Sequence, residues 1–90
     1  MEFEQIKILQ IENKNGLHAR AASKIAMIAK NAMSNVWIVK DDQKADASSV
    51  LDILMLDCAK GTKIAIEVDD HKDINILNNM VKLVKNGFGE

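Results

Sequence analysis

The sequence predicts an α+β domain in which helices cover one face of an antiparallel sheet. Two segments alternate apolar and polar residues with the period of two that is typical of strands, and Val36–Lys40 is rich in β-branched residues. Other segments carry apolar residues three and four positions apart, as amphipathic helices do. No linker, repeat or low-complexity segment interrupts the chain, so residues 1–90 are expected to form one domain.

The first half of the chain is predicted to hold a strand, a helix and a β-hairpin. Ile6, Ile8 and Ile11 follow a loose alternation that predicts a strand, which the polar turn 13–16 ends. Small and apolar residues at helical spacing then predict a helix over 19–30. The hairpin consists of a strand over 36–40, a turn over 41–43 and a short strand over 44–46.

A short apolar helix over 50–56 is predicted next. Ser48 or Ser49 is a natural N-cap, because a serine hydroxyl can accept a hydrogen bond from the first turn. We expect the segment to end at Lys60-Gly61, where glycine can adopt the left-handed C-cap conformation.

The last predicted elements are a strand over 64–68 and a C-terminal helix. Ile64, Ile66 and Val68 alternate with polar residues. A charged turn over 69–73 follows, in which Asp70 or Asp73 can cap the helix. The element order is therefore β-α-β-β-α-β-α. The apolar stripe of the last helix, which ends at Asn86-Gly87, consists of Ile74, Leu77, Met80, Val81 and Val84.

The composition excludes several classes of protein. The net charge is −1 with charges spread along the chain, and aromatic residues make up 3%, so nothing indicates a nucleic-acid surface. No apolar run is long enough to span a membrane, and no signal peptide is evident. The single cysteine cannot form an internal disulfide. We expect a cytoplasmic protein that binds neither nucleic acid nor membranes, with no cofactor or metal.

The most informative residue is His18, which lies between the Asn15-Gly16 turn and a helix start. A lone histidine is more often a solvated or core residue than a functional one, but burial is not expected at this position. The N-terminus of a helix favours an anion, because its first N–H groups lack partners and carry the positive end of the dipole. A neutral imidazole is a nucleophile, and Arg20 could pair with phosphate oxygens. The segment therefore suggests a phosphohistidine.

The helix over 50–56 carries more apolar residues than two turns can bury. Some of Val50, Leu51 and Leu54 are expected to stay exposed as a docking patch, or else to cap the core at a sheet edge. If the patch is exposed, Ser49 is placed to control it, since a phosphate there adds charge beside an apolar interface.

Other residues are expected to have structural roles. His71 stands among Asp69, Asp70 and Asp73, but a solvated turn is favoured over a metal site. Cys58 is interpreted as a small buried side chain, and Lys60–Lys63 lacks the context of a phosphate loop. Packing roles are predicted for Trp37, Met33, Met55, Met80 and Met27, the last partly exposed.

The run from Gly16 to Ala22 resembles the active-site motif of the HPr family, the histidine-containing phosphocarriers of the bacterial phosphoenolpyruvate phosphotransferase system. The resemblance covers essentially the whole chain: Ser48–Leu51 matches the family's regulatory-serine helix, and Asn86–Gly89 matches a common ending. The run Leu54–Gly61 is similar to the nitrogen-related paralogue NPr. The resemblance implies an open-faced β-sandwich, a four-stranded antiparallel sheet covered on one face by three helices.

By this resemblance, His18 would accept a phosphoryl group on Nδ1 from phosphorylated enzyme I and pass it to IIA-type proteins. The protein would then be a carrier rather than a turnover enzyme, and is expected to be a monomer. The N–H groups of Ala19 and Arg20 and the Arg20 side chain would hold the phosphate. Ser49 would be the serine that HPr kinase/phosphorylase modifies. The implied partner surface consists of Ala19, Ser23, Val50, Leu51 and Leu54.

The chain departs from the family's pattern at a few positions. Ala21 stands where the family usually has proline, so the helix start is expected to be less rigid. Asp52 and Met27 replace basic residues of some members, which lowers the positive charge near the docking patch. An alternative function is a regulatory binding module, controlled by Ser49 phosphorylation, that acts in carbon or nitrogen regulation. A metal-dependent hydrolase around His71 has little support.

Overall fold

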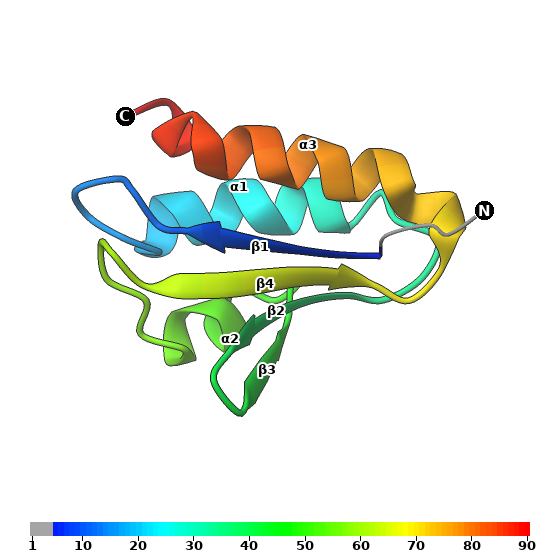
Figure 1. The fold of residues 1–90 in the computed structure, drawn as a ribbon, viewed down its shortest axis with the longest axis horizontal. Helices are drawn as coiled ribbons and strands as arrows, with labels where there is room; N and C mark the ends of the chain where they lie inside the picture. Colours follow the sequence, from blue (N-terminus) through cyan, green and yellow to red (C-terminus); the bar gives the residue numbers. More distant parts are fainter. Residues whose placement is uncertain (1–4) are drawn as a thin grey trace.

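A computed structural model, which describes residues 5–90, contains the elements in the predicted order (Figure 1). None of the helices in that range is long and apolar enough to span a membrane. The elements are β1 (Ile6–Gln10), α1 (Ala19–Ala29), β2 (Val36–Lys40), β3 (Gln43–Asp46), α2 (Val50–Met55), β4 (Lys63–Val68) and α3 (Ile74–Lys85), with short 3-10 helices η1 (His71–Asp73) and η2 (Gly87–Gly89).

The strands form one four-stranded sheet in the order β1-β4-β2-β3, and every neighbouring pair is antiparallel. In the register, Ile38 of β2 lies opposite Ala45 of β3 and Ile66 of β4. These side chains are buried under the helices, whereas Ile8 on the other face is 75% exposed. The predicted open-faced sandwich is therefore confirmed.

Small residues let α1 lie close to the sheet. Ala21 and Ala22 are fully buried, and α1 and α3 run side by side over the sheet (Figure 1). The core gains hydrophobic stabilisation from both layers. Its fully buried large side chains include Ile25, Ile38, Ile53, Ile64, Ile66, Leu77, Met80, Val84 and Phe88.

The open face of the sheet carries Trp37, for which a packing role was predicted, and two isoleucines of β1. Ile6 and Ile8 point to this face, while Ile11 beyond the strand is buried, so the alternation predicted the strand but not its buried side. Trp37 is only half-buried: its ring lies under the Lys44 ammonium at 4.9 Å, and its Nε1–H donates to Asp69 at 3.0 Å.

The packing prediction was right for Met80 but wrong for two other methionines. Met33 and Met55 are 75% and 74% exposed, and Met27, expected to be partly exposed, is 69% exposed. Met33 lies in the loop after α1, and Met55 lies in the last turn of a helix that buries only Ile53 beneath it. Neither position has a second layer to pack against.

The predicted range of the second helix, 50–56, was right to within one residue, but its predicted C-cap at Gly61 was wrong. The helix stops at Leu56, its C-cap, and Asp57 takes the left-handed conformation at φ 55°. Aspartate tolerates this conformation better than most residues. The residues before and after Asp57, Leu56 and Cys58, are both buried. Gly61 instead lies in the turn into β4, where its N–H donates to the Ile11 carbonyl at 2.7 Å.

Asp73, at the start of α3, is 2% exposed and fastens the loop between α1 and β2. Its carboxylate accepts hydrogen bonds from the Met33 N–H and from the N–H and hydroxyl of Ser34. It therefore does not cap its own helix; Asp70 caps η1 through the Lys72 N–H. Burial alone raises the pKa of the Asp73 carboxyl, but the hydrogen bonds from Met33 and Ser34 bring the pKa below its ordinary value.

Candidate functional site

The loop between β1 and α1 positions His18. Gly16 has φ +63°, and a Cβ on it would lie 2.3 Å from the Cys58 carbonyl oxygen, so this approach requires glycine. The next N–H, of Leu17, donates to the same carbonyl at 2.8 Å. His18 follows as the N-cap of α1 in an extended conformation. The connection from α2 to β4 therefore supports the histidine loop.

Both ring nitrogens of His18 face acceptors. Nδ1 lies 3.2 Å from the Gly16 carbonyl oxygen, and Nε2 lies 3.0 Å from Glu90 Oε2, while the side chain is 32% exposed. An imidazole can donate from both nitrogens only when it is protonated, so the neutral ring must give up one of these contacts. The ring is accessible, and its tautomer is set by these two neighbours.

Glu90 reaches His18 through a fixed turn at the C-terminal end of α3. Phe88 has φ 59° and is only 1% exposed. Its carbonyl accepts a 2.6 Å hydrogen bond from Lys24 Nζ on α1. Glu90 could not be identified from the sequence, because a contact across 72 positions leaves no local pattern. The only signal was the Asn86–Gly89 ending, which marks the turn but not the direction of the carboxylate.

The start of α1 provides donors beside the ring. The Ala22 N–H makes the first helical hydrogen bond, to the His18 carbonyl, so the N–H groups of Ala19, Arg20 and Ala21 precede it without helical acceptors. Ala19 and Arg20 are exposed, and within residues 5–90 the Arg20 guanidinium has no ion-pair partner. The structure thus brings together His18, Arg20 and the helix end, a combination suited to a phosphoryl group.

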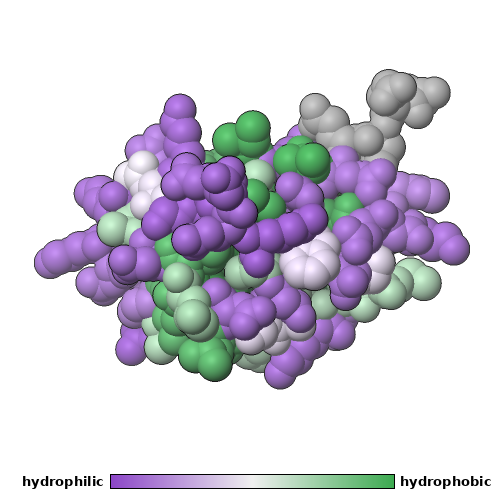
Figure 2. Space-filling view, turned by 90° about the horizontal axis from the view of Figure 1, so that it is seen from below, coloured by the Kyte–Doolittle hydropathy of each residue, from purple (hydrophilic) through white to green (hydrophobic). Residues whose placement is uncertain are grey.

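An apolar surface lies on α2 and α1. Leu51 and Leu54 are 68% and 37% exposed, as one of the two sequence-based alternatives predicted, whereas Val50 packs partly against the core. Met55 extends this surface, and Figure 2 shows hydrophobic residues on the underside of the molecule at the end where α2 lies. On α1, which contacts α2, one helix face carries Ala19, Ser23 and Met27, four positions apart and all exposed.

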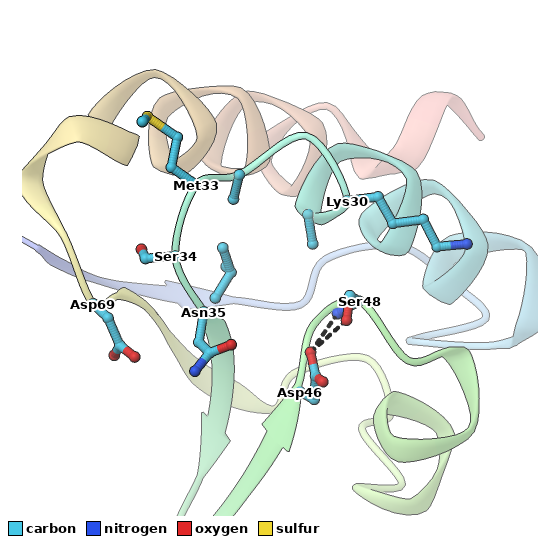
Figure 3. A pocket seen from close by; sticks show the side chains of 10 residues that line it. Lys30, Met33, Ser34, Asn35, Asp46, Ser48 and Asp69 are labelled. Carbon is cyan, nitrogen blue, oxygen red and sulfur yellow. Dashed lines mark hydrogen bonds between the residues drawn. The ribbon is translucent and has the colours of Figure 1, made fainter.

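The two neighbouring serines have different environments. The Ser49 hydroxyl is the N-cap of α2 and accepts a hydrogen bond from the Asp52 N–H at 3.2 Å. The Ser48 hydroxyl and N–H both donate to Asp46 Oδ1, at 2.7 and 2.9 Å (Figure 3). Ser48 lines a cavity of about 600 Å³ beside the loop after α1, with Ser34 and Asn35 on its other side (Figure 3). Ser49 therefore belongs to the apolar surface and Ser48 to a separate cavity.

His71 and Cys58 lie away from His18's ring contacts. His71 is exposed, with Nδ1 3.5 Å from Asp70, and no three metal-ligating side chains gather within residues 5–90. Cys58 is 5% exposed, as expected for a small buried side chain, and its burial raises the pKa of the thiol.

The chain is similar to known proteins over most of its length. The family model described as the phosphotransferase-system HPr component phosphorylation site matches residues 6–86. Phosphocarrier protein HPr of Neisseria meningitidis is 37% identical over 82 residues, covering 91% of this chain and 92% of the relative. Phosphocarrier protein NPr of Klebsiella oxytoca is 37% identical over 83 residues, with the same coverage. The crystal structure of HPr from Thermoanaerobacter tengcongensis matches with a TM-score of 0.90 at 29% identity, covering 97% of this chain and 98% of that one.

Proposed function

This chain belongs to the HPr family of phosphocarrier proteins of the phosphotransferase system, and from that premise we propose that His18 is the residue that carries the phosphoryl group. The observation that carries the proposal is the position of a partly exposed imidazole at the start of α1, next in sequence to helix N–H groups without helical acceptors and to Arg20. Arg20 and the N–H groups of Ala19 and Arg20 would hold the phosphate oxygens.

In this proposal, His18 Nδ1 receives the group from phosphorylated enzyme I and gives it to IIA-type proteins. The Nδ1 lone pair forms an N–P bond as the donor's bond to phosphorus breaks, and the donor nitrogen keeps the electron pair. This step requires a free lone pair on Nδ1, so Nδ1 cannot be donating a proton to the Gly16 carbonyl when the group arrives. The positive end of α1 then favours the anion.

We propose that these partners dock on the apolar surface of Leu51, Leu54 and Met55, together with Ala19, Ser23 and Met27 of α1. Val50 supports this surface from below more than it contributes to it. Asp52 and Met27 make it less basic than that of members with basic residues there, so attraction to acidic partner surfaces would be weaker. The protein would act in the cytoplasm as a single domain and a monomer, and a free Cys58 fits a reducing compartment.

Incubation with phosphoenolpyruvate and enzyme I tests the proposal. We expect one acid-labile phosphohistidine signal by phosphorus NMR for the wild type and none for His18→Ala. His71→Ala is the matched control, because it removes the other histidine while leaving α1 intact, and it should be labelled fully. Equal labelling of His18→Ala and the wild type would refute the assignment.

Ala21→Pro is expected to accelerate phosphotransfer, because proline fixes φ in the first turn of α1 and so makes the helix start beside His18 more rigid. Ala21 lies in the first turn of α1, before the first helical hydrogen bond, so a proline removes no helical N–H contact there. Stopped-flow transfer from phosphorylated enzyme I measures the rate. Because Ala21 is fully buried, circular dichroism must first show an unchanged fold. Equal rates in a folded variant would contradict the expectation.

A second function, regulation through Ser49, is favoured by the position of its hydroxyl at the N-terminus of the helix that carries the docking surface. A phosphate on Ser49 would add charge beside Leu51 while remaining near a helix end that tolerates anions. On Ser48 the phosphate would meet the Asp46 carboxylate instead.

In an assay with ATP and an HPr kinase, acid-stable label is therefore expected on the wild type and on Ser48→Ala but not on Ser49→Ala. Phosphosite mapping reports the modified serine. Label that persists in Ser49→Ala and disappears in Ser48→Ala would reverse the assignment, and absence of acid-stable label from the wild type would remove this second function.

A further inference from the structure

Asn13 is a buried polar residue at the end of the chain segment that leads to the histidine loop. It is 6% exposed and lies five positions before His18. Its Nδ2 group donates to the Gly16 carbonyl at 2.8 Å and to Glu90 Oε1 at 3.2 Å. Its buried Oδ1 accepts no hydrogen bond from residues 5–90. Buried polar atoms without partners are rare in native proteins, so this orientation requires an explanation.

The two acceptors fix the orientation of the amide. If it were reversed, Oδ1 would face two oxygen atoms, and the two N–H donors would be buried without acceptors. Both acceptors also contact His18: the Gly16 carbonyl lies at Nδ1 and the Glu90 carboxylate lies at Nε2. Asn13, Gly16, His18 and Glu90 thus close a ring of hydrogen-bonding contacts in which Asn13 has no contact with the imidazole itself.

We propose that Asn13 is a positioning residue that selects the tautomer of neutral His18 with hydrogen on Nε2 and a free lone pair on Nδ1. The proposal deepens the proposed function and rests on Nδ1 being the phosphoryl acceptor. A neutral ring has one N–H, which can go to the Gly16 carbonyl from Nδ1 or to the Glu90 carboxylate from Nε2. Because Asn13 already donates to the Gly16 carbonyl, that oxygen does not need the histidine proton.

The contact of Asn13 with the Glu90 carboxylate also favours the Nε2–H tautomer. Its bond to Oε1 holds the Glu90 carboxylate so that Oε2 faces Nε2, and a hydrogen bond to a charged acceptor is stronger than one to a neutral carbonyl. After phosphorylation, Nδ1 carries the phosphoryl group and cannot donate to Gly16. The carbonyl then keeps Asn13 as its donor, so phosphorylation does not leave the Gly16 oxygen without a hydrogen bond.

The experiment is two-dimensional NMR of the ring nitrogens, on ¹⁵N-histidine protein without phosphoryl donor, at a pH where the imidazole is neutral. We expect the Nε2–H tautomer in the wild type. Asn13→Leu, which keeps the approximate size without donors, is expected to raise the ratio of Nδ1–H to Nε2–H at His18 about five- to tenfold, the scale set by one ordinary hydrogen bond. Asn13→Asp, nearly isosteric but also without donors, is expected to shift it in the same direction.

Asn31→Leu is the matched control, because Asn31 also donates a side-chain hydrogen bond to a backbone carbonyl, but at the far end of α1. Its tautomer ratio should equal that of the wild type, and His71 is an internal reference in every sample. The rate of phosphorylation by enzyme I should fall with the loss of the Nε2–H tautomer, while the KM for enzyme I stays unchanged because the docking surface is untouched.

An unchanged ratio in folded Asn13→Leu and Asn13→Asp, or a wild type dominated by Nδ1–H, overturns the role of Asn13. A tautomer shift as expected in a protein whose wild type accepts no phosphoryl group would instead reject the proposed function and leave the assignment of the tautomer to Asn13 standing. The two failures are thus distinguishable.

Discussion

Gly16→Ala is expected to lower the free energy of unfolding by about 2–5 kcal/mol, from roughly 1–2 for a left-handed φ and 1–3 for the steric clash. The new Cβ would lie 2.3 Å from the Cys58 carbonyl oxygen, and backbone atoms cannot move aside as the end of a flexible side chain can. The same shift would stretch the bond from the Leu17 N–H to that carbonyl and displace His18. Urea denaturation measures the free energy of unfolding. The rate of phosphorylation by enzyme I, measured on the folded variant without urea, reports whether His18 is displaced.

Gly61→Ala is the matched control for this prediction. Gly61 also has a left-handed φ, +93°, but an added Cβ would meet nothing within 4 Å. The loss should therefore be limited to about 1–2 kcal/mol of backbone strain. If both variants lost the same stability, the close approach of Gly16 to Cys58 would not be the cause.

Asp73→Ala is expected to lower the free energy of unfolding by about 2–3 kcal/mol near neutral pH, since hydrogen bonds to a charged acceptor contribute more than neutral ones. The change removes the acceptor of the Met33 and Ser34 N–H groups and frees the loop between α1 and β2. Asp70→Ala, which removes one bond to Lys72 at a less buried carboxylate, should cost less. Equal losses for the two variants would contradict the role assigned to the buried carboxylate.

The same residue predicts how stability depends on pH. The hydrogen bonds hold the pKa of Asp73 below its value in the unfolded chain, about 3.9. The stabilisation is then complete above that value and is lost as the pH falls through the lower pKa of the folded state. Urea titrations over a pH series should show the wild type and Asp73→Ala converging at the acid end. A constant difference between them down to the lowest pH would show that the charge of Asp73 does not contribute.

The fold was predictable because each element has a strong local pattern. The alternation of Ile64, Ile66 and Val68 and the helical spacing of the last stripe depend only on neighbours along the chain, and both elements were found where expected. The left-handed residue after α2 was not predictable in this way. Its position depends on the burial of Leu56 and Cys58 on either side of Asp57, which is a tertiary requirement, whereas Gly61 offered only a local preference.

The candidate site also combines residues that a local pattern indicates with residues that only the fold brings together. His18 and Arg20 could be identified because the turn and the helix start are adjacent in sequence, and one helix carries Leu51 and Leu54. The second neighbour of the imidazole, Glu90, comes from the other end of the chain, and the role of Asn13 exists only once Glu90 is in place. An asparagine in a polar turn is ordinary, so its buried amide could be recognised only in three dimensions.

The hydrogen bonds between the histidine loop and the segment after α2 have a mechanical consequence. The Leu17 N–H binds the Cys58 carbonyl at 2.8 Å, and Ile11 and Gly61–Thr62 exchange bonds of 2.8 and 2.7 Å, so both ends of the loop are tied to the chain that leaves the docking helix. These backbone hydrogen bonds therefore couple the position of the histidine loop to that of the segment that follows α2. In the proposed function, a partner that docks on α2 would therefore find His18 at a distance and angle set by the fold, and docking would supply the alignment that in-line transfer requires.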